Sequence, residues 1–160
     1  MSDQVKDIQK TLISAITALL KDNKVVQRMF DDFDVNVDEI DSIPIDFADL
    51  KVSAKTKDGH VYLNQALLED DDFKDDIHYI VHEAAHWLQQ THGEPRNYLK
   101  EDYDEYLDLP SEVEAFKYQV MFIADFQSMS DAETYVEELL DFHEFEDEAR
   151  DCKRKELIGE

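Results

Sequence analysis

One long segment of the sequence repeats apolar residues at the spacing of an α-helix, and this repeat constrains the fold more than any other feature. At about 100° per residue, five of its residues fall on one side of a helix: Phe73, Ile77, Ile80, Ala84 and Leu88. Gly93 and Pro95 follow the segment, and both residue types end helices. The pattern therefore predicts a helix over residues 72–91 that lies against a hydrophobic core.

The residues before this segment predict two helices and then short strands. Helical spacing predicts a helix over residues 3–21, and Asn23 is placed to cap a short second helix. Alternation of apolar and polar residues predicts strands over 33–37, 43–47, 50–54 and 60–64. A Lys-Asp-Gly turn at residues 57–59 favours a hairpin of the last two strands, and the strand that contains Pro44 is expected at an edge.

The residues after the long segment are predicted to be helical again. A polar, Tyr-rich loop is expected over 94–110, and a helix starts after Pro110. Another helix is expected to start at Ser130, where Ser130 and Glu133 have capping-box spacing, and to continue to about Lys155. Helix, strands and then helices is the α+β layout. With three Gly and three Pro in the chain there is little room for linkers, so one domain over 1–160 is expected.

The charge of the chain restricts its partners. Forty Asp and Glu against sixteen Lys and Arg give a net charge of −24. Nucleic acid and an anionic membrane are therefore disfavoured, whereas basic partners are favoured. The charge fits either a solubilising surface or an acidic protein that binds a basic partner or mimics DNA, and composition does not separate the two. The single cysteine, Cys152, and the lack of a signal-peptide or membrane-spanning pattern favour the cytoplasm.

The predicted helix over 72–91 carries the motif His82-Glu83-Ala84-Ala85-His86. Two histidines four residues apart project from the same face of a helix, so their ring nitrogens can reach one zinc ion. Glu83 lies beside them and can accept a proton from an attacking water molecule. Both histidines fall roughly opposite the apolar side of the helix. The alternative is a pair of surface histidines that contact only water.

A third metal ligand is expected in the helix that starts after Pro110. Glu114 has a capping role available, since Ser111 and Glu114 have capping-box spacing. Glu112 instead falls within the apolar stripe of that helix, which comprises Val113, Phe116, Val120 and Ile123. A carboxylate aimed into an apolar face is costly unless a cation meets it. We therefore expect Glu112 to be the ligand; the alternative is a first-turn acid stabilised by the helix dipole.

His82-Glu83-x-x-His86 followed by Glu112-x-x-Ala115 resembles the gluzincin pattern of zinc metallopeptidases, in particular the compact single-domain proteins of phage and bacteria that include repressor-cleaving peptidases. The segment over residues 61–64 resembles the strand that enters the active-site helix in that group. The resemblance implies a zincin-like α+β fold, with a small twisted antiparallel or mixed sheet packed on the motif helix and further helices at both ends.

The same resemblance implies a zinc peptidase that hydrolyses a peptide bond. His82, His86 and Glu112 would bind Zn²⁺, and Glu83 would be the general base. A protein or peptide substrate would lie along the edge of the hairpin near Val52 and Val61. One position departs from the pattern: larger gluzincins often carry an Asp four residues after the ligand Glu, where this chain has Phe116. The residues that orient the histidines must then come from elsewhere.

Other residues have weaker expectations. His78 lies one turn before His82 and is expected to be exposed; lining the cleft, or acting as a fourth ligand of a structural zinc, are the alternatives. His92 is expected at the end of the helix, where a positive charge interacts favourably with the helix dipole. His92 or a loop tyrosine could also stabilise an oxyanion. The tyrosines are Tyr98, Tyr103 and Tyr106, and Trp87 is expected to pack against a neighbouring element. A C-terminal apolar stripe is expected to be core or partner surface: Tyr135, Leu139, Phe142, Phe145 and Ala149.

Overall fold

Three short strands make a mixed sheet, and its hairpin follows from the turn residues. The strands are β1 (Ile45–Ala48), β2 (Ala54–Lys57) and β3 (His60–Asn64), in the order β1-β3-β2. β2 runs antiparallel to β3, and β1 runs parallel to it. Asp58 and Gly59 connect β2 to β3 with φ of 53° and 76°, a left-handed backbone that glycine adopts without strain. The hairpin and the edge position of the Pro44 segment are thus as expected.

The computed structural model describes residues 3–69, 73–92, 107 and 109–158. Within them it is a mixed α+β structure that is mostly helical. No helix among the described residues is both long enough and apolar enough to span a membrane.

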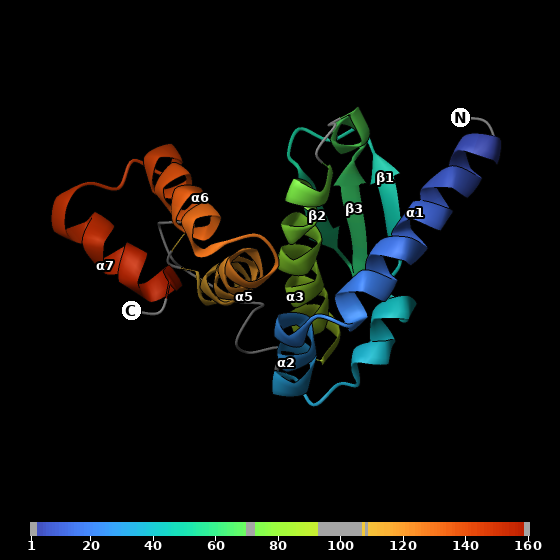
Figure 1. Ribbon diagram of the computed structural model, residues 1–160, viewed down its shortest axis with the longest axis horizontal. Helices are drawn as coiled ribbons and strands as arrows, with labels where there is room; N and C mark the ends of the chain where they lie inside the picture. Colours follow the sequence, from blue (N-terminus) through green and yellow to red (C-terminus); the bar gives the residue numbers. More distant parts are fainter. Residues whose placement is uncertain (1–2, 70–72, 93–106, 108, 159–160) are drawn as a thin grey trace.

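The sheet lies against α3 (His78–His92), the helix that carries the His-Glu-Ala-Ala-His motif. β3 alternates as a half-buried strand does, with Val61 and Leu63 buried and their neighbours partly exposed. Figure 1 shows α3 between the sheet on one side and α5 (Pro110–Phe126) on the other. Because α3 is covered on both sides, His82 is buried and His86 is partly buried.

The N-terminal helices close one end of this arrangement. α1 (Asp3–Lys21) lies beside β1, and α2 (Lys24–Asp32) packs against α5 (Figure 1). The Oδ1 atom of Asn23 accepts hydrogen bonds from the backbone N–H groups of Val25 and Val26, so the expected cap is confirmed.

α5 has two apolar faces, and each belongs to a different cluster. Ala115, Tyr118 and Phe122 pack with α2, α3 and the sheet, whereas Phe116 and Val120 pack with the C-terminal helices. These are α6 (Met129–Phe142) and α7 (Asp147–Ile158), which lie on the side of α5 away from the sheet (Figure 1). α5 is therefore the element that joins the two halves of the core.

Two strand predictions need correction. Residues 33–37 form no strand: α2 ends at Asp32, Asp34 has φ of 59°, and a 3-10 helix (Val37–Ser42) follows. The strand expected over residues 50–54 begins instead at Ala54 and continues to Lys57.

The helix predictions at 72–91 and 130–155 were also partly wrong. A 3-10 helix (Phe73–Asp76) precedes α3, which therefore starts at His78. The helix expected to continue to Lys155 breaks between α6 and α7, where Glu144 and Asp147 have φ of 61° and 52°. Its cap is Ser128 rather than Ser130, with Ser128 Oγ accepting from the Asp131 N–H.

Candidate metal and catalytic site

The two motif histidines lie one turn apart on α3 and direct the same ring atom to one point. His82 Nε2 and His86 Nε2 are 3.2 Å apart, and the ring centroids are 4.8 Å apart. Both side chains face α5, and Phe116 of α5 packs against the His82 ring at 4.5 Å. The face of α3 that carries these histidines is therefore covered by α5 and does not contact only water.

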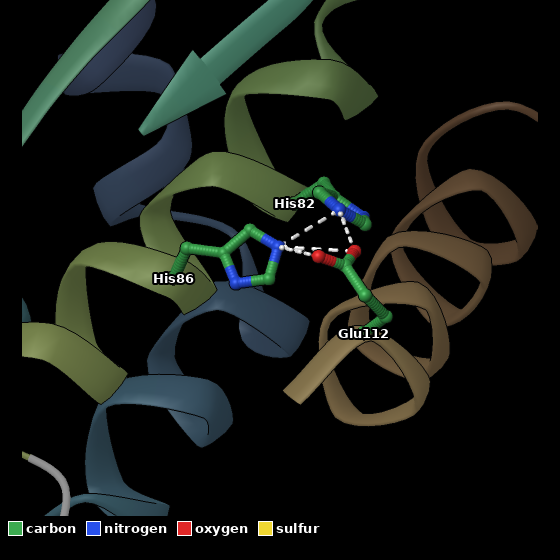
Figure 2. A group of neighbouring side chains, drawn as sticks. All are labelled: His82, His86 and Glu112. Atoms are coloured by element: carbon green, nitrogen blue, oxygen red, sulfur yellow. Dashed lines mark hydrogen bonds and ion pairs between the residues drawn. The ribbon is translucent and has the colours of Figure 1, made fainter. Parts of the chain in front are cut away.

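Glu112 approaches the same point from the first turn of α5. Its Oε1 atom lies 3.1 Å from His82 Nε2 and 3.2 Å from His86 Nε2. Figure 2 shows the three side chains pointing toward one another, the histidines from α3 and the glutamate from α5. Of the two candidate glutamates, the structure thus brings Glu112 to the histidines, as the apolar stripe indicated.

The electrostatics of the three residues reflect their proximity. Burial alone would raise the pKa of Glu112, but its hydrogen bonds with His82 and His86 outweigh burial and hold that pKa well below its ordinary value. Burial likewise acts to lower the pKa of His86, yet the bond to Glu112 and its negative charge raise it to about 9. The carboxylate therefore creates a place that favours a positive charge between the two rings.

A glutamine holds the other nitrogen of each ring. His82 Nδ1 donates to Gln119 Oε1 at 2.8 Å, and His86 Nδ1 donates to Gln89 Oε1 at 2.7 Å. An imidazole that donates from Nδ1 keeps its Nε2 lone pair free when it is neutral. Both lone pairs then point at the Glu112 carboxylate. Three electron-rich groups converge, and such a cluster needs a proton or a metal ion to be stable.

The separations within this cluster suit a tetrahedral zinc ion. Two ligand atoms that each lie about 2.05 Å from zinc are roughly 3.3 Å apart at a tetrahedral angle. The three ligand–ligand separations here are 3.1, 3.2 and 3.2 Å. Two histidines and one carboxylate are also a donor set that zinc takes in catalytic sites, with one position left for water or substrate. His82, His86 and Glu112 could therefore hold a zinc ion, and they are the one such group among the described residues.

Glu83 is buried next to the triad formed by His82, His86 and Glu112, and its carboxylate contacts the sheet. Thr56 Oγ1, on β2, lies 2.9 Å from Glu83 Oε1 and donates to it. β2 is an edge strand among the described residues, so it carries the Glu83 contact and still has one unpaired side. The carboxylate is thus oriented by a neutral donor, which leaves its second oxygen available to exchange a proton.

His78 is buried and lies outside the triad. The Nε2 atom of Gln119 donates to His78 Nδ1 at 2.7 Å, so the amide bridges His78 and His82. Burial, followed by the nearby His82, lowers the pKa of His78 to about 4. The expectation of an exposed His78 was wrong, and the described geometry gives it no place as a fourth ligand.

A groove of about 560 Å³ reaches His82 and Glu83, whereas His86 and Glu112 are not among the residues that line it. His82, Glu83 and Gln119 line it, together with Lys51 to Ala54 on one segment and residues near the end of α6 on another. A substrate that enters the groove therefore meets His82 and Glu83 together.

Three features of the site were not anticipated from sequence. Gln89 and Gln119 take the place of the orienting residues that the Phe116 departure left missing, and Thr56 holds Glu83. Gln119 has a detectable signal, since it lies seven residues after Glu112 and is a buried amide within an apolar stripe. Gln89 also has a local signal, since it lies three residues after His86 on the same helix, whereas the contact of Thr56 with Glu83 joins distant segments.

The remaining expectations have mixed outcomes. The Ser111–Glu114 capping box was wrong, because the N-cap of α5 is Leu109 and Glu114 Oε1 accepts from Gln89 Nε2. Trp87 is buried as expected, and His92 lies in the last turn of α3. Tyr98, Tyr103 and Tyr106 lie outside the described residues.

Comparison with known proteins gives no relative. Protein-family models, curated proteins and solved structures were each compared with this chain, and none of them matches it. The function of the chain therefore has to be inferred from the chemistry of His82, His86 and Glu112 and of the groove beside them.

Proposed function

We propose that this chain is a zinc-dependent peptidase of zincin-like fold that hydrolyses a peptide bond in a protein or peptide substrate. The observation that carries the proposal is the convergence of His82 Nε2, His86 Nε2 and the Glu112 carboxylate within 3.1–3.2 Å of one another. Of these residues, His82 lines a groove that Glu83 also lines. The resemblance of the motif to gluzincins supports the same conclusion.

The three residues of the triad would be the metal ligands, and two glutamines orient the histidine rings. His82, His86 and Glu112 would bind the ion, while Gln119 and Gln89 keep both Nε2 atoms directed at it. The chemistry that such an ion supplies is Lewis-acid polarisation of the scissile carbonyl and of water. The burial of the triad keeps bulk water away and so strengthens these interactions.

Glu83 carries the proton in this proposal. Its carboxylate takes a proton from the attacking water as the carbon–oxygen bond forms, and passes it to the leaving nitrogen as the carbon–nitrogen bond breaks. The hydrogen bond from Thr56 Oγ1 fixes one carboxylate oxygen and leaves the other to perform both transfers. An extended peptide would lie beside residues 51–54, the wall formed by the segment that leads into β2.

Metal content and cleavage together test the proposal. Purified chain is expected to contain one zinc ion, and His82→Ala is expected to lose it. Glu83→Gln removes the proton acceptor without removing a ligand, so this variant should keep the zinc and cleave a peptide mixture about 10²–10⁴-fold more slowly. Wild-type protein that takes up no zinc, or a Glu83→Gln variant that cleaves at the wild-type rate, contradicts the proposal.

The net charge of −24 supports a second candidate, a non-enzymatic acidic protein that binds a basic partner or mimics DNA. Such a protein needs neither zinc nor Glu83. Binding of a basic partner that survives both His82→Ala and Glu83→Gln, without any cleavage, favours this candidate. A zinc ion that is retained in both Glu83→Gln and wild type with no cleavage by either favours a structural zinc instead.

A further inference from the structure

Two large apolar side chains that line the groove are exposed to solvent. Val52, in the segment before β2, is 54% exposed, and Phe142, the last residue of α6, is 82% exposed. Both residues line the groove that contains His82 and Glu83. Water-exposed phenylalanine is unfavourable in the free protein, and apolar residues gathered at a concave site commonly mark a contact surface.

The exposure of Phe142 follows from the way α6 divides its apolar residues. One stripe, Ala132, Val136 and Leu140, is buried in the C-terminal part of the core. A second stripe, Tyr135, Leu139 and Phe142, is spaced by four and then three residues and lines the groove, and Tyr135 and Leu139 also pack against the buried cluster. The stripe expected to be core or partner surface is therefore split, and three of its residues line the groove.

The position of Phe142 is held by its surroundings. α6 ends at this residue, and the ring of His143 meets the Phe142 ring edge-on at 5.1 Å. The chain then turns away through Glu144, which has φ of 61°. Phe142 thus stands at the rim of the groove without entering the core, while Phe116 supplies an apolar floor beside His82.

We propose that the space between Val52 and Phe142 is a subsite for a large apolar side chain of the peptide substrate. This inference rests on the proposed peptidase function and adds a substrate class to it. An extended peptide beside residues 51–54 directs alternate side chains to the same side, so one residue near the scissile bond can insert between Val52 and Phe142. The inserted side chain removes both exposed apolar groups from water.

Zinc-binding probes test the subsite without a known substrate. Acetylglycine hydroxamate and acetylphenylalanine hydroxamate carry the same zinc-binding group and differ only in the side chain. Their affinities for zinc-loaded wild-type protein are measured by isothermal titration calorimetry. The phenylalanine probe is expected to bind about 10-fold tighter or more, which is the selectivity that an apolar pocket provides.

Substitutions at Val52 and Phe142 then test whether these two residues cause the preference for the phenylalanine probe. Val52→Ser and Phe142→Ser should fold, because both side chains are exposed, and each should reduce the affinity ratio to about 3-fold or less. Ile8→Ser is the matched control, since Ile8 is 62% exposed on α1, away from the groove, and should leave the ratio unchanged. Equal binding of the two probes by wild type, or an unchanged ratio in both groove variants, overturns the subsite while the metal site stands. Failure of both probes to bind overturns the proposed function and the subsite with it.

Discussion

The direction in which each triad imidazole points depends on one glutamine side chain. Gln89 already donates from Nε2 to the Ser111 carbonyl and to Glu114 Oε1, so it must present its oxygen to His86. Gln119 donates in the same way to His78 and presents its oxygen to His82. In both cases the amide cannot rotate without breaking bonds to a neighbouring element. The tautomer of each histidine is therefore fixed before any metal arrives.

Gln89→Ala should weaken zinc binding because it frees the His86 ring to rotate. Loss of such an orienting partner typically lowers metal affinity about 10–100-fold, and competition with a fluorescent chelator measures it. Gln90→Ala is the matched control, because Gln90 lies next in the same helix and accepts from the Gly59 N–H instead. Equal zinc affinity in the two variants would show that the Gln89 contact has no part in orienting His86.

His78 predicts a specific pH dependence of stability. Its pKa falls from 6.5 to about 4 on folding, mainly because burial penalises the charged form. Between these values the unfolded chain binds a proton that the folded chain does not, so stability rises with pH and is lost as pH falls from 6.5 toward 4. His78→Gln removes this contribution, which is on the order of 3 kcal/mol.

Urea unfolding at several pH values, in the presence of EDTA, measures the effect. The other ionisable groups are common to wild type and variant, so the difference between the two curves isolates His78. His92→Gln, at an exposed site in the last turn of α3, should give a curve parallel to that of wild type. Parallel curves for wild type and His78→Gln would mean that His78 is not buried as a neutral imidazole.

At the level of elements, local patterns predicted helices and the hairpin better than they predicted breaks. α1 and β3 have the predicted bounds, because helical spacing and alternation each extend over the whole element. The alternation at 33–37 misled, because Asn36 Oδ1 caps a 3-10 turn through the Asp38 N–H. The break between α6 and α7 has no Gly or Pro, and its left-handed residues are Glu144 and Asp147. Acidic residues are not typical of left-handed positions in the way glycine is, so the sequence contains little indication of this helix break.

The convergence of His82, His86 and Glu112 could be predicted from the sequence, whereas the residues that surround them were not predicted. The spacing of His82 and His86 and the apolar surroundings of Glu112 are local facts of two helices. The bridge from Gln119 to His78 depends instead on the packing of α5 against α3, which no local pattern specifies. The burial of His78 was missed for the same reason, since a wheel of α3 alone suggests an exposed face.

Glu137 ties the last two helices together. On α6, it receives hydrogen bonds from Arg150 and Arg154 of α7, at 2.8 Å and 2.6 Å. Glu137→Gln should destabilise the chain by about 1–2 kcal/mol, because two arginines lose a charged partner and the pair is partly solvent-screened. Glu133→Gln, at an exposed site on the same helix, is the control. Thermal unfolding at pH 7 measures both.

The same pair of variants has a signed pH dependence. The two arginines lower the pKa of Glu137 from 4.5 to about 2. The stabilisation is present above pH 4.5 and is lost as pH falls through about 2, so the wild type and Glu137→Gln should converge over that range. High salt should also reduce their difference at pH 7. A difference that persists at pH 2 would mean that packing, and not charge, explains the loss.

For the whole molecule, the triad lies where the two halves of the core meet. α3 belongs to the cluster that contains the sheet, whereas α5 also faces the C-terminal cluster through Phe116 and Val120. An ion held by His82, His86 and Glu112 would therefore link α3 to α5. The ion would also offset part of a net charge of −24, which disfavours the compact state by self-repulsion.

Zinc should accordingly raise the melting temperature, because it binds the folded chain and the triad does not exist in the unfolded one. At a free zinc concentration of 100 times Kd the stabilisation is about 2.7 kcal/mol. Forty acidic residues can also attract divalent cations without a site, and calcium at the same concentration measures that contribution, since it prefers oxygen ligands. His82→Ala should lose the zinc-specific increase, while His60→Ala, on the sheet, should keep it. An increase that calcium reproduces in full, or that His82→Ala retains, would mean that zinc acts on the charge of the whole surface and not at the junction of α3 and α5.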